Sequence, residues 1–201
     1  AALYPGQEGA AAVVRLLLGD VNPSGKLPVT FPRRYADNPT HANYPGARDV
    51  VYTEGIFVGY RYYDRKGIKP LFPFGFGLSY TTFEYSGLRV PLRVRIGQPI
   101  HVSVTVTNTG LRAGREVVQL YVADKKASLP RPPKELKGFA KIALAPGESR
   151  RVLFALRKRD LSFYDPARKQ WVVEPGAFRI LLGASSRDIR QERSVQVTPQ
   201  R

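Results

Sequence analysis

Apolar and polar residues alternate along most of the second half of the chain. In the clearest run, Val102, Val104 and Val106 are separated by single polar residues, and a turn sequence follows at 108–110. A period of two places every second side chain on the same face of a β-strand, so this run predicts a strand with one buried face. Comparable runs predict further strands near residues 88–94, 116–123, 136–144, 151–156, 161–164, 170–174, 178–182 and 193–197.

The number and spacing of these strands favour one fold class. About eight short strands, separated by turn sequences and with no helical pattern between them, are typical of an antiparallel β-sandwich of the immunoglobulin or fibronectin type III kind. We therefore predict a β-sandwich over residues 87–201, in which Tyr164 and Trp171 are core or corner residues.

The first 34 residues carry a different pattern. Residues 7–18 predict a helix that is apolar nearly all round, so we expect most of its surface to be buried. Residues 26–31 predict a short strand, in which Pro28 favours a sheet edge or an irregular end. One helix and one strand cannot bury this apolar surface alone, so we expect partner elements upstream of Ala1. The absence of methionine agrees with that expectation, because the chain then has no initiator.

Residues 32–80 are rich in aromatic, proline and glycine residues. Disordered linkers avoid aromatic residues, so we expect an ordered connector that joins two domains. Residues 54–63 are its most strand-like part, and residues 71–77 predict turns. Packing in a core is the commoner role for such rings, and stacking on sugars or bases beside Arg61 and Arg65 is the alternative.

Positive charge is concentrated in the second half of the chain. The formal net charge is +16, and residues 87–201 hold 23 of the 32 Lys and Arg residues but only 9 of the 16 acidic residues. The basic residues alternate singly with apolar ones, which suits the solvent face of strands. A surface for an anionic polymer or nucleic acid is the alternative. No apolar run is long enough to predict a membrane span, and the compartment stays open.

Acidic residues are the main candidates for catalysis. Glu54 and Asp64 border the aromatic connector and are the most interesting of them, although an ion pair with Arg61 is the simpler interpretation. The other acids have ordinary structural interpretations at helix ends, in loops or near turns: Glu8, Asp20, Asp37, Asp49, Asp165 and Glu174.

Other catalytic motifs are missing from the sequence. Cysteine is absent, and His41 and His101 lie far apart without the spacing of metal ligands. The turn-like segments hold Ser24, Ser79 and Ser86, but none of these serines lies in a nucleophile elbow. No glycine motif for phosphate follows a strand. The residues therefore indicate no catalytic, metal or cofactor-binding site, and no cofactor.

Ordered sequence blocks cover nearly all of the chain. The first half contains Tyr4-Pro-Gly-Gln-Glu-Gly9, the segment 18–32, Tyr52-Thr-Glu-Gly-Ile-Phe-Val-Gly-Tyr-Arg-Tyr-Tyr-Asp64 and Pro73-Phe-Gly-Phe-Gly-Leu-Ser-Tyr-Thr82. The second half contains Glu116-Val-Val-Gln-Leu-Tyr121, Arg131-Pro-Pro-Lys-Glu-Leu-Lys-Gly-Phe139, Leu144-Ala-Pro-Gly-Glu148 and Trp171-Val-Val-Glu-Pro-Gly176. These blocks resemble the closing part of glycoside hydrolase family 3, the β-glucosidase and β-xylosidase family, with its fibronectin type III-like domain.

The resemblance implies a division into three parts. Residues 1–34 are expected to be the truncated C-terminal end of an α/β sandwich domain. Residues 35–86 are the aromatic connector, and residues 87–201 are the fibronectin type III-like β-sandwich. Phe76 departs from the family pattern, because relatives often carry histidine at this position.

The resemblance also implies a function for the intact enzyme, as a retaining exo-acting β-glycosidase. The family's nucleophilic Asp and acid/base Glu lie upstream of Tyr4, so the chain is expected to be inactive alone, and Glu8 does not inherit the acid/base role. Expected partners are the upstream catalytic domains of the same polypeptide and a β-glucoside substrate, with no specific nucleic acid. A basic β-sandwich that binds an anionic polysaccharide or another polyanion is the alternative function.

Overall fold

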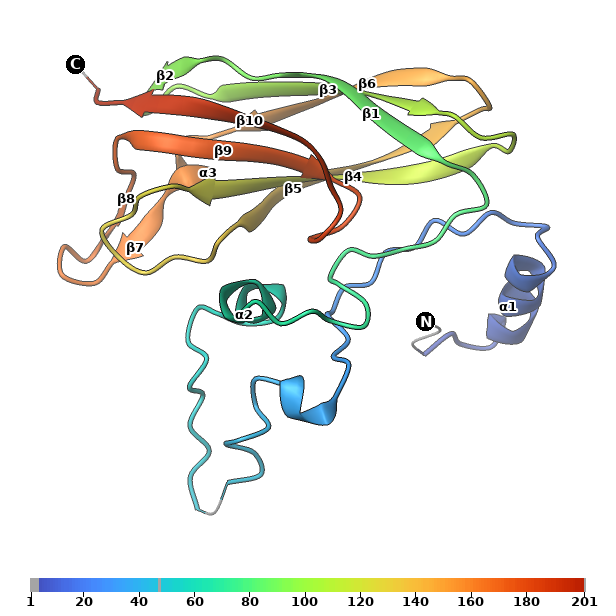
Figure 1. The fold of residues 1–201 in the computed structure, drawn as a ribbon, viewed down its shortest axis with the longest axis horizontal. Coiled ribbons are helices and arrows are strands. Elements are labelled where there is room, and N and C mark those ends of the chain that lie inside the picture. The colour runs from blue at the N-terminus through green and yellow to red at the C-terminus, as the bar shows by residue number, and fades with distance from the viewer. Residues whose placement is uncertain (1–3, 47, 201) are drawn as a thin grey trace.

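The computed structural model describes residues 4–46 and 48–200, and a β-sandwich forms its largest part (Figure 1). One sheet has three strands in the order β1-β3-β6, and the other has five in the order β2-β10-β9-β4-β5. All neighbouring strands are antiparallel except β2 and β10, which run parallel. The strands of the two sheets are β1 (Phe83–Arg89), β2 (Arg93–Arg95), β3 (Ile100–Asn108), β4 (Gly114–Asp124), β5 (Glu135–Leu144), β6 (Ser149–Leu156), β9 (Gly176–Gly183) and β10 (Ile189–Thr198).

The core of the sandwich comes from the alternating residues of the sequence. Val102, Val104 and Val106 of β3 are almost completely buried, and they meet apolar residues of β4 and β9 such as Leu120 and Ile180. Alternation buries these side chains because neighbouring residues of a strand point to opposite faces of its sheet. The predicted β-sandwich is therefore confirmed. Two predicted strands differ in their bounds, because residues 90–92 separate β1 from β2 and the run at 161–164 becomes a strand only at Phe163.

A small hairpin at one end of the sandwich differs from expectation. It consists of β7 (Phe163–Asp165) and β8 (Gln170–Val172), and it follows the short helix α3 (Lys158–Leu161). Tyr164 and Trp171 face each other on this hairpin with ring centroids 5.8 Å apart, and each is 48% exposed. The guanidinium of Arg159 covers one side of the Trp171 ring. The two aromatic residues are thus half-exposed, so the core alternative of the prediction was wrong.

The N-terminal helix α1 (Gly9–Leu17) forms as predicted but is not buried. Val14, Leu17 and Leu18 are 51%, 77% and 75% exposed. Hydrogen bonds link α1 to the rest of the chain near its C-terminal end. There, the Tyr80 hydroxyl donates a hydrogen bond to the Leu16 carbonyl, at 2.6 Å.

Residues 26–31 do not form the predicted strand. The segment is extended and pairs irregularly with residues 71–76, and Phe31 and Phe72 form a single β-bridge. Prolines explain the interruption, because Pro28 on one side and Pro73 on the other have no N–H to donate.

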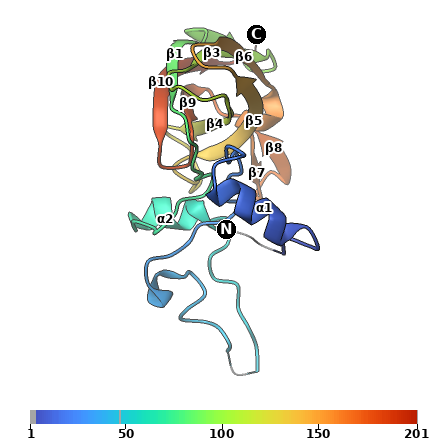
Figure 2. The same ribbon diagram turned by 90° about the vertical axis from the view of Figure 1, so that its right-hand side faces the viewer.

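In the described part of the connector before β1, the chain forms two helical segments and no strand. They are the 3-10 helix η1 (Tyr35–Asp37) and the α-helix α2 (Tyr60–Lys66), so the strand predicted at 54–63 was wrong. Gly67 ends α2 in the left-handed conformation, with φ of +65°. Between η1 and α2 the chain projects away from the sandwich in both views (Figure 1, Figure 2). No helix in the described ranges is long and apolar enough to cross a membrane.

Candidate functional site

Helix α2 is held against the edge of the five-stranded sheet by buried charges. Asp64 of α2 accepts from both Lys134 and Arg187 of the sandwich, with 2.8 Å to the Arg187 Nε, and its own side chain is only 5% exposed. One turn earlier, Arg61 pairs with Glu135 at 3.2 Å. We call these five residues the α2 junction.

The helical period explains why α2 presents these residues together. Tyr60 and Asp64 are four residues apart, and Tyr63 lies beside them, so all three fall on one side of the helix. Tyr63 is 3% exposed, and the Tyr60 hydroxyl accepts a hydrogen bond from the Leu136 N–H at 2.8 Å. The Tyr60 ring stacks on Phe74 with a centroid distance of 5.0 Å. The connector is therefore bound to the sandwich through both charged and aromatic contacts.

Glu135 is the centre of the charged part of this contact. Besides Arg61 it contacts Arg131 at 2.9 Å and Lys137 at 3.5 Å. Burial raises the pKa of Glu135, but Lys137, Arg131 and Arg61 outweigh it and hold that pKa below its usual value. Arg131 also bridges to Asp124 at 3.2 Å. The Glu135 carboxylate is thus matched by cations that favour its charged form.

A buried glutamine holds the segment after α2. Gln119 of β4 donates to the carbonyls of Gly75 and Ala184, at 3.1 and 2.8 Å, and accepts from the Tyr121 hydroxyl at 2.6 Å. Gly75 has a φ of +78°, and a Cβ atom there would lie 2.2 Å from the Gln119 Oε1. Glycine is therefore required at this close approach.

The acids singled out from the sequence do not form a catalytic pair. Asp64 belongs to the α2 junction, whereas the buried Oε2 of Glu54 has no hydrogen-bond partner among the described residues. The expected ion pair of Arg61 with one of these two acids was wrong, because Arg61 pairs with Glu135. Cleavage of a glycosidic bond needs two carboxyl groups that face each other across the substrate, one of them able to donate a proton. Asp64 instead binds Lys134 and Arg187 of the sandwich.

The remaining acids singled out from the sequence lie apart from one another. Asp37 pairs with Arg34, Asp165 with Arg168, and Glu174 accepts from the Ser128 N–H. Glu8 precedes α1 and Asp20 follows it, and Asp49 lies in the projecting loop. No group of three or more His, Asp and Glu side chains within 4–46 and 48–200 is arranged to hold a metal ion, and neither His41 nor His101 belongs to one.

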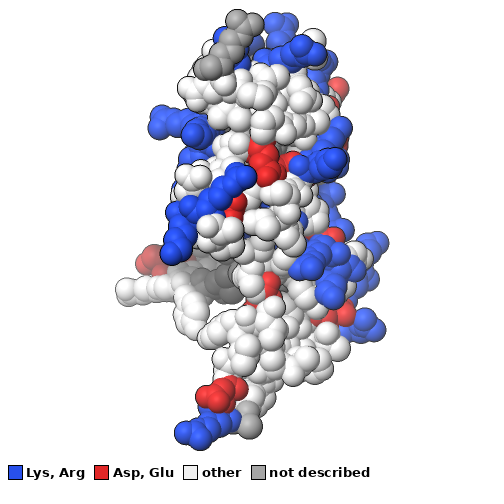
Figure 3. Space-filling model, turned by 90° about the vertical axis from the view of Figure 1, so that its left-hand side faces the viewer, with Lys and Arg blue, Asp and Glu red and all other residues white. Residues whose placement is uncertain are grey.

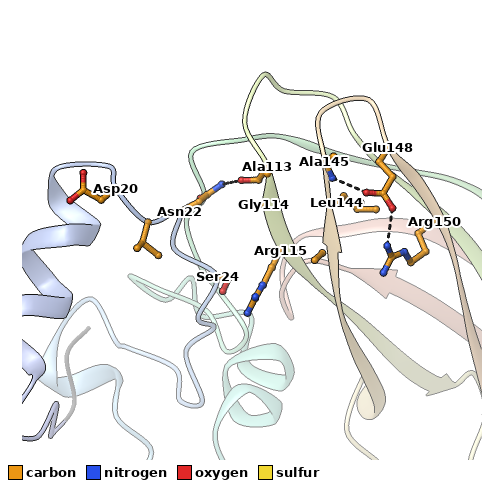
Figure 4. Close-up of a pocket in the computed structure, with 12 residues that line it drawn as sticks. Asp20, Asn22, Ser24, Ala113, Gly114, Arg115, Leu144, Ala145, Glu148 and Arg150 are labelled. Carbon is orange, nitrogen blue, oxygen red and sulfur yellow. Dashed lines mark hydrogen bonds and ion pairs between the residues drawn. The ribbon is translucent and has the colours of Figure 1, made fainter.

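A hollow lies where the chain after α1 crosses the sandwich (Figure 4). It has a volume of about 630 Å³. Asn22 fixes this crossing, because it donates to the Ala113 carbonyl at 2.9 Å and accepts from the Tyr80 N–H at 2.8 Å. At the far side, Glu148 accepts from the Ala145 N–H and from Arg150. The hollow is open, and its two acidic residues, Asp20 and Glu148, lie at opposite sides of it (Figure 4).

Several residues of these contacts were not singled out from the sequence. Asn22 appeared only within the block 18–32, and Lys134 and Glu135 only within the block 131–139. Their signal was nevertheless present, because the block 131–139 places four charged residues at the start of an otherwise apolar strand. Ser24 lines the hollow, Ser79 hydrogen-bonds Asn22, and Ser86 is part of β1.

Two models of known protein families match parts of the chain. A model of the glycosyl hydrolase family 3 C-terminal domain matches residues 1–60, and a model of the fibronectin type III-like domain matches residues 116–186. The chain corresponds to the C-terminal region of glycoside hydrolase family 3 proteins. Both parts of the resemblance seen in the sequence are therefore confirmed.

Known members of glycoside hydrolase family 3 match along nearly the whole chain. Thermostable beta-glucosidase B from Acetivibrio thermocellus is 55% identical over 194 residues, which cover 96% of this chain and 26% of that protein. Beta-glucosidase BoGH3A from Bacteroides ovatus is 46% identical over 93% of this chain and 26% of its own length. The chain thus spans about a quarter of the length of these curated relatives.

Solved structures of the family share the fold. The crystal structure of Bifidobacterium adolescentis GH3 beta-glucosidase matches with a TM-score of 0.90 and 43% identity, over 95% of this chain and 28% of that chain. The structure of beta-glucosidase 3B from Thermotoga neapolitana in complex with alpha-D-glucose matches with a TM-score of 0.88 and 45% identity, over 94% of this chain and 27% of that chain. The arrangement of connector and sandwich is therefore one that family 3 β-glucosidases share.

Proposed function

We propose that the chain is a non-catalytic part of a β-glucosidase and supports the catalytic domains of the same polypeptide. In the intact enzyme an Asp attacks the anomeric carbon while a Glu protonates the leaving oxygen, and water then releases the sugar. Neither residue is assigned to this chain. The observation that carries this proposal is the charge pairing at the α2 junction, which gives Asp64 and Glu135 a structural role in place of a catalytic one.

The proposal assigns a role to each part of the chain. Residues 1–34 complete an α/β sandwich domain, residues 35–86 form the connector, and residues 87–201 form the fibronectin type III-like domain. The exposed apolar side of α1 supports the first assignment, because Leu17 and Leu18 expose three quarters of their surface. Neighbouring exposed apolar side chains of this kind mark a surface that another part of the protein covers.

The sandwich acts as a rigid support in this proposal. Asn22 and the Lys26–Glu116 ion pair, at 2.9 Å, attach the segment after α1 to the sandwich. The α2 junction attaches the other end of the connector. Two separate attachments fix the direction in which α1 leaves the sandwich, and so fix where the catalytic domains sit.

Reconstitution tests this function. The chain is mixed with the remaining N-terminal part of the Acetivibrio thermocellus enzyme, and hydrolysis of 4-nitrophenyl β-D-glucoside is measured. We expect no turnover by the chain alone and turnover by the mixture. Leu17→Asp on α1 is expected to abolish reconstitution, because it places a charge on the contact surface. The matched control is Leu92→Asp, at an 80% exposed site between β1 and β2, and it is expected to reconstitute normally.

Two outcomes would contradict the proposal. Turnover by the chain alone that disappears in Glu54→Gln would show that a catalytic carboxyl lies within the chain. Equal reconstitution by Leu17→Asp and Leu92→Asp would show that α1 does not contact the catalytic domains.

A further inference from the structure

A hollow on the outer face of the three-stranded sheet gathers basic side chains. It has a volume of about 340 Å³ and lies across β1, β3 and β6. This sheet is on the side of the sandwich opposite the connector (Figure 1). The lining includes the basic side chains Arg89, His101 and Arg151, together with Ser103.

Strand register brings these side chains together over one residue. Arg89 lies directly opposite Ser103 in the pairing of β1 with β3, and His101 is two residues from Ser103 on the same face. Arg151 of β6 donates a hydrogen bond to the Ser103 hydroxyl at 2.9 Å. Ser103 is only 6% exposed although it points away from the core, because longer side chains surround it.

The positive charge in this hollow is not balanced. No acidic residue lines it, and neither Arg89 nor Arg151 forms an ion pair with a described residue. The acid of β1, Glu84, lies opposite Thr107, which is four residues from Ser103 and so about 13 Å along the strand. On the neighbouring side of β6, by contrast, Arg150 is paired with Glu148.

The charge on the rest of the surface is arranged differently. On the face drawn in Figure 3, basic side chains lie in several separate groups with uncharged or acidic atoms between them. Many basic side chains elsewhere are paired, as Arg179 is with Glu192 at 2.6 Å. Two unpaired guanidinium groups that converge on one concave site are therefore distinct from the scattered charge.

We propose that this hollow binds an acidic sugar unit of a polysaccharide, through a carboxylate or sulfate group. Arg89 and Arg151 supply planar, forked donors that match an oxyanion, and Ser103 orients one of them. Val90, Pro91 and Leu153 add an aliphatic surface beside the charges, and Leu153 is 70% exposed. Such a surface suits the C–H face of a sugar ring, which a free inorganic anion lacks.

The same lining argues against nucleic acid as the ligand. Binding of single strands relies on exposed aromatic rings on which bases stack. The aromatic side chain of this hollow, Phe154, packs against the sandwich core and is only partly exposed.

Binding to defined oligosaccharides tests the proposal on the full chain. Isothermal titration uses oligogalacturonate for the carboxylate, sulfated cello-oligosaccharide for the sulfate, and neutral cello-oligosaccharide as the uncharged probe. We expect one or both acidic probes to bind and the neutral probe not to bind. In the double variant Arg89→Gln/Arg151→Gln, the affinity is expected to fall at least tenfold. Ser103→Ala is expected to give a smaller loss, because it removes only the group that orients Arg151.

Arg93→Gln/Arg95→Gln is the matched control, because Arg93 and Arg95 are exposed arginines of β2 in the other sheet. It removes the same two charges and is expected to change the affinity less than twofold. Thermal unfolding of each variant checks that the fold is intact. Equal losses in Arg93→Gln/Arg95→Gln and in Arg89→Gln/Arg151→Gln would overturn the proposal, as would equal binding of the neutral probe. Single-stranded DNA that binds more tightly than both acidic probes would also overturn it.

Discussion

Replacement of Asp64 by asparagine is expected to release α2 from the sandwich. The change keeps the size of the side chain but removes the charge that faces Lys134 and Arg187. Removal of one partner from a fully buried ion pair costs about 3–5 kcal/mol, whereas exposed pairs are worth less than about 1 kcal/mol. The Asp64 side chain is 5% exposed, but its partners are 13% and 37% exposed. We therefore expect a loss of about 2–3 kcal/mol.

Native-state proteolysis measures this loss at the helix itself. Trypsin cleaves after Arg65 and Lys66 in the last turn of α2, and it needs that turn to open locally. A loss of about 2–3 kcal/mol raises the open population, and so the cleavage rate, about 30- to 150-fold. Mass spectrometry of the first fragments identifies the bond that is cut.

A matched control separates the junction from a general effect of lost charge. Glu192→Gln removes an acid from an exposed pair with Arg179, in which both side chains are about 40% exposed. We expect it to change cleavage less than fivefold. If Asp64→Asn is cut at the rate of the unsubstituted chain, the ion pairs of the junction do not hold α2, and the reasoning is refuted.

Two further predictions concern a close backbone approach and the pH dependence of stability. Gly75→Ala places a Cβ against Gln119 at a positive φ, so a loss of about 2–4 kcal/mol is expected in urea unfolding. Gly25→Ala, which meets open space, is expected to change stability by less than about 0.5 kcal/mol, and equal losses would contradict this. The pKa of Glu135 is lower in the folded state than in the unfolded state. The charged Glu135 therefore stabilises the fold above its unfolded-state pKa, and this contribution is lost as the pH falls through the folded-state pKa. Between pH 7 and 3.5, the free energy of unfolding is expected to fall less in Glu135→Gln than in the unsubstituted chain. An equal fall in both would contradict this.

The sandwich could be predicted from the sequence because local sequence patterns determine its strands and turns. Alternation along β3 decides which side chains are buried, and glycine, proline and asparagine decide where the strands turn. Even within the sandwich, the structural role of Asn108 was not predicted. Asn108 was predicted only as a turn residue, but it is fully buried and donates to the Leu144 carbonyl at 3.1 Å while accepting from Thr81 at 2.6 Å.

The connector was less predictable because tertiary contacts decide its structure. Residues 54–63 are rich in aromatic and β-branched residues, which favour strands, yet α2 forms where Tyr60 and Asp64 both find partners on the sandwich. Those partners are 70 or more positions away in the sequence, so no local pattern indicates them. The apolar character of α1 was seen correctly, but the sequence cannot tell which surface covers it.

The Phe31–Phe72 bridge and the α2 junction also define a stretch of chain with two fixed ends. Residues 32–59 leave one fixed point and return to another, and between them they project away from the sandwich (Figure 2). The distance between the two points does not depend on the length of the stretch that joins them. Away from buried residues such as Phe57, which contacts Arg65 of α2, a change in the length of this stretch is therefore expected to cost little in loop closure.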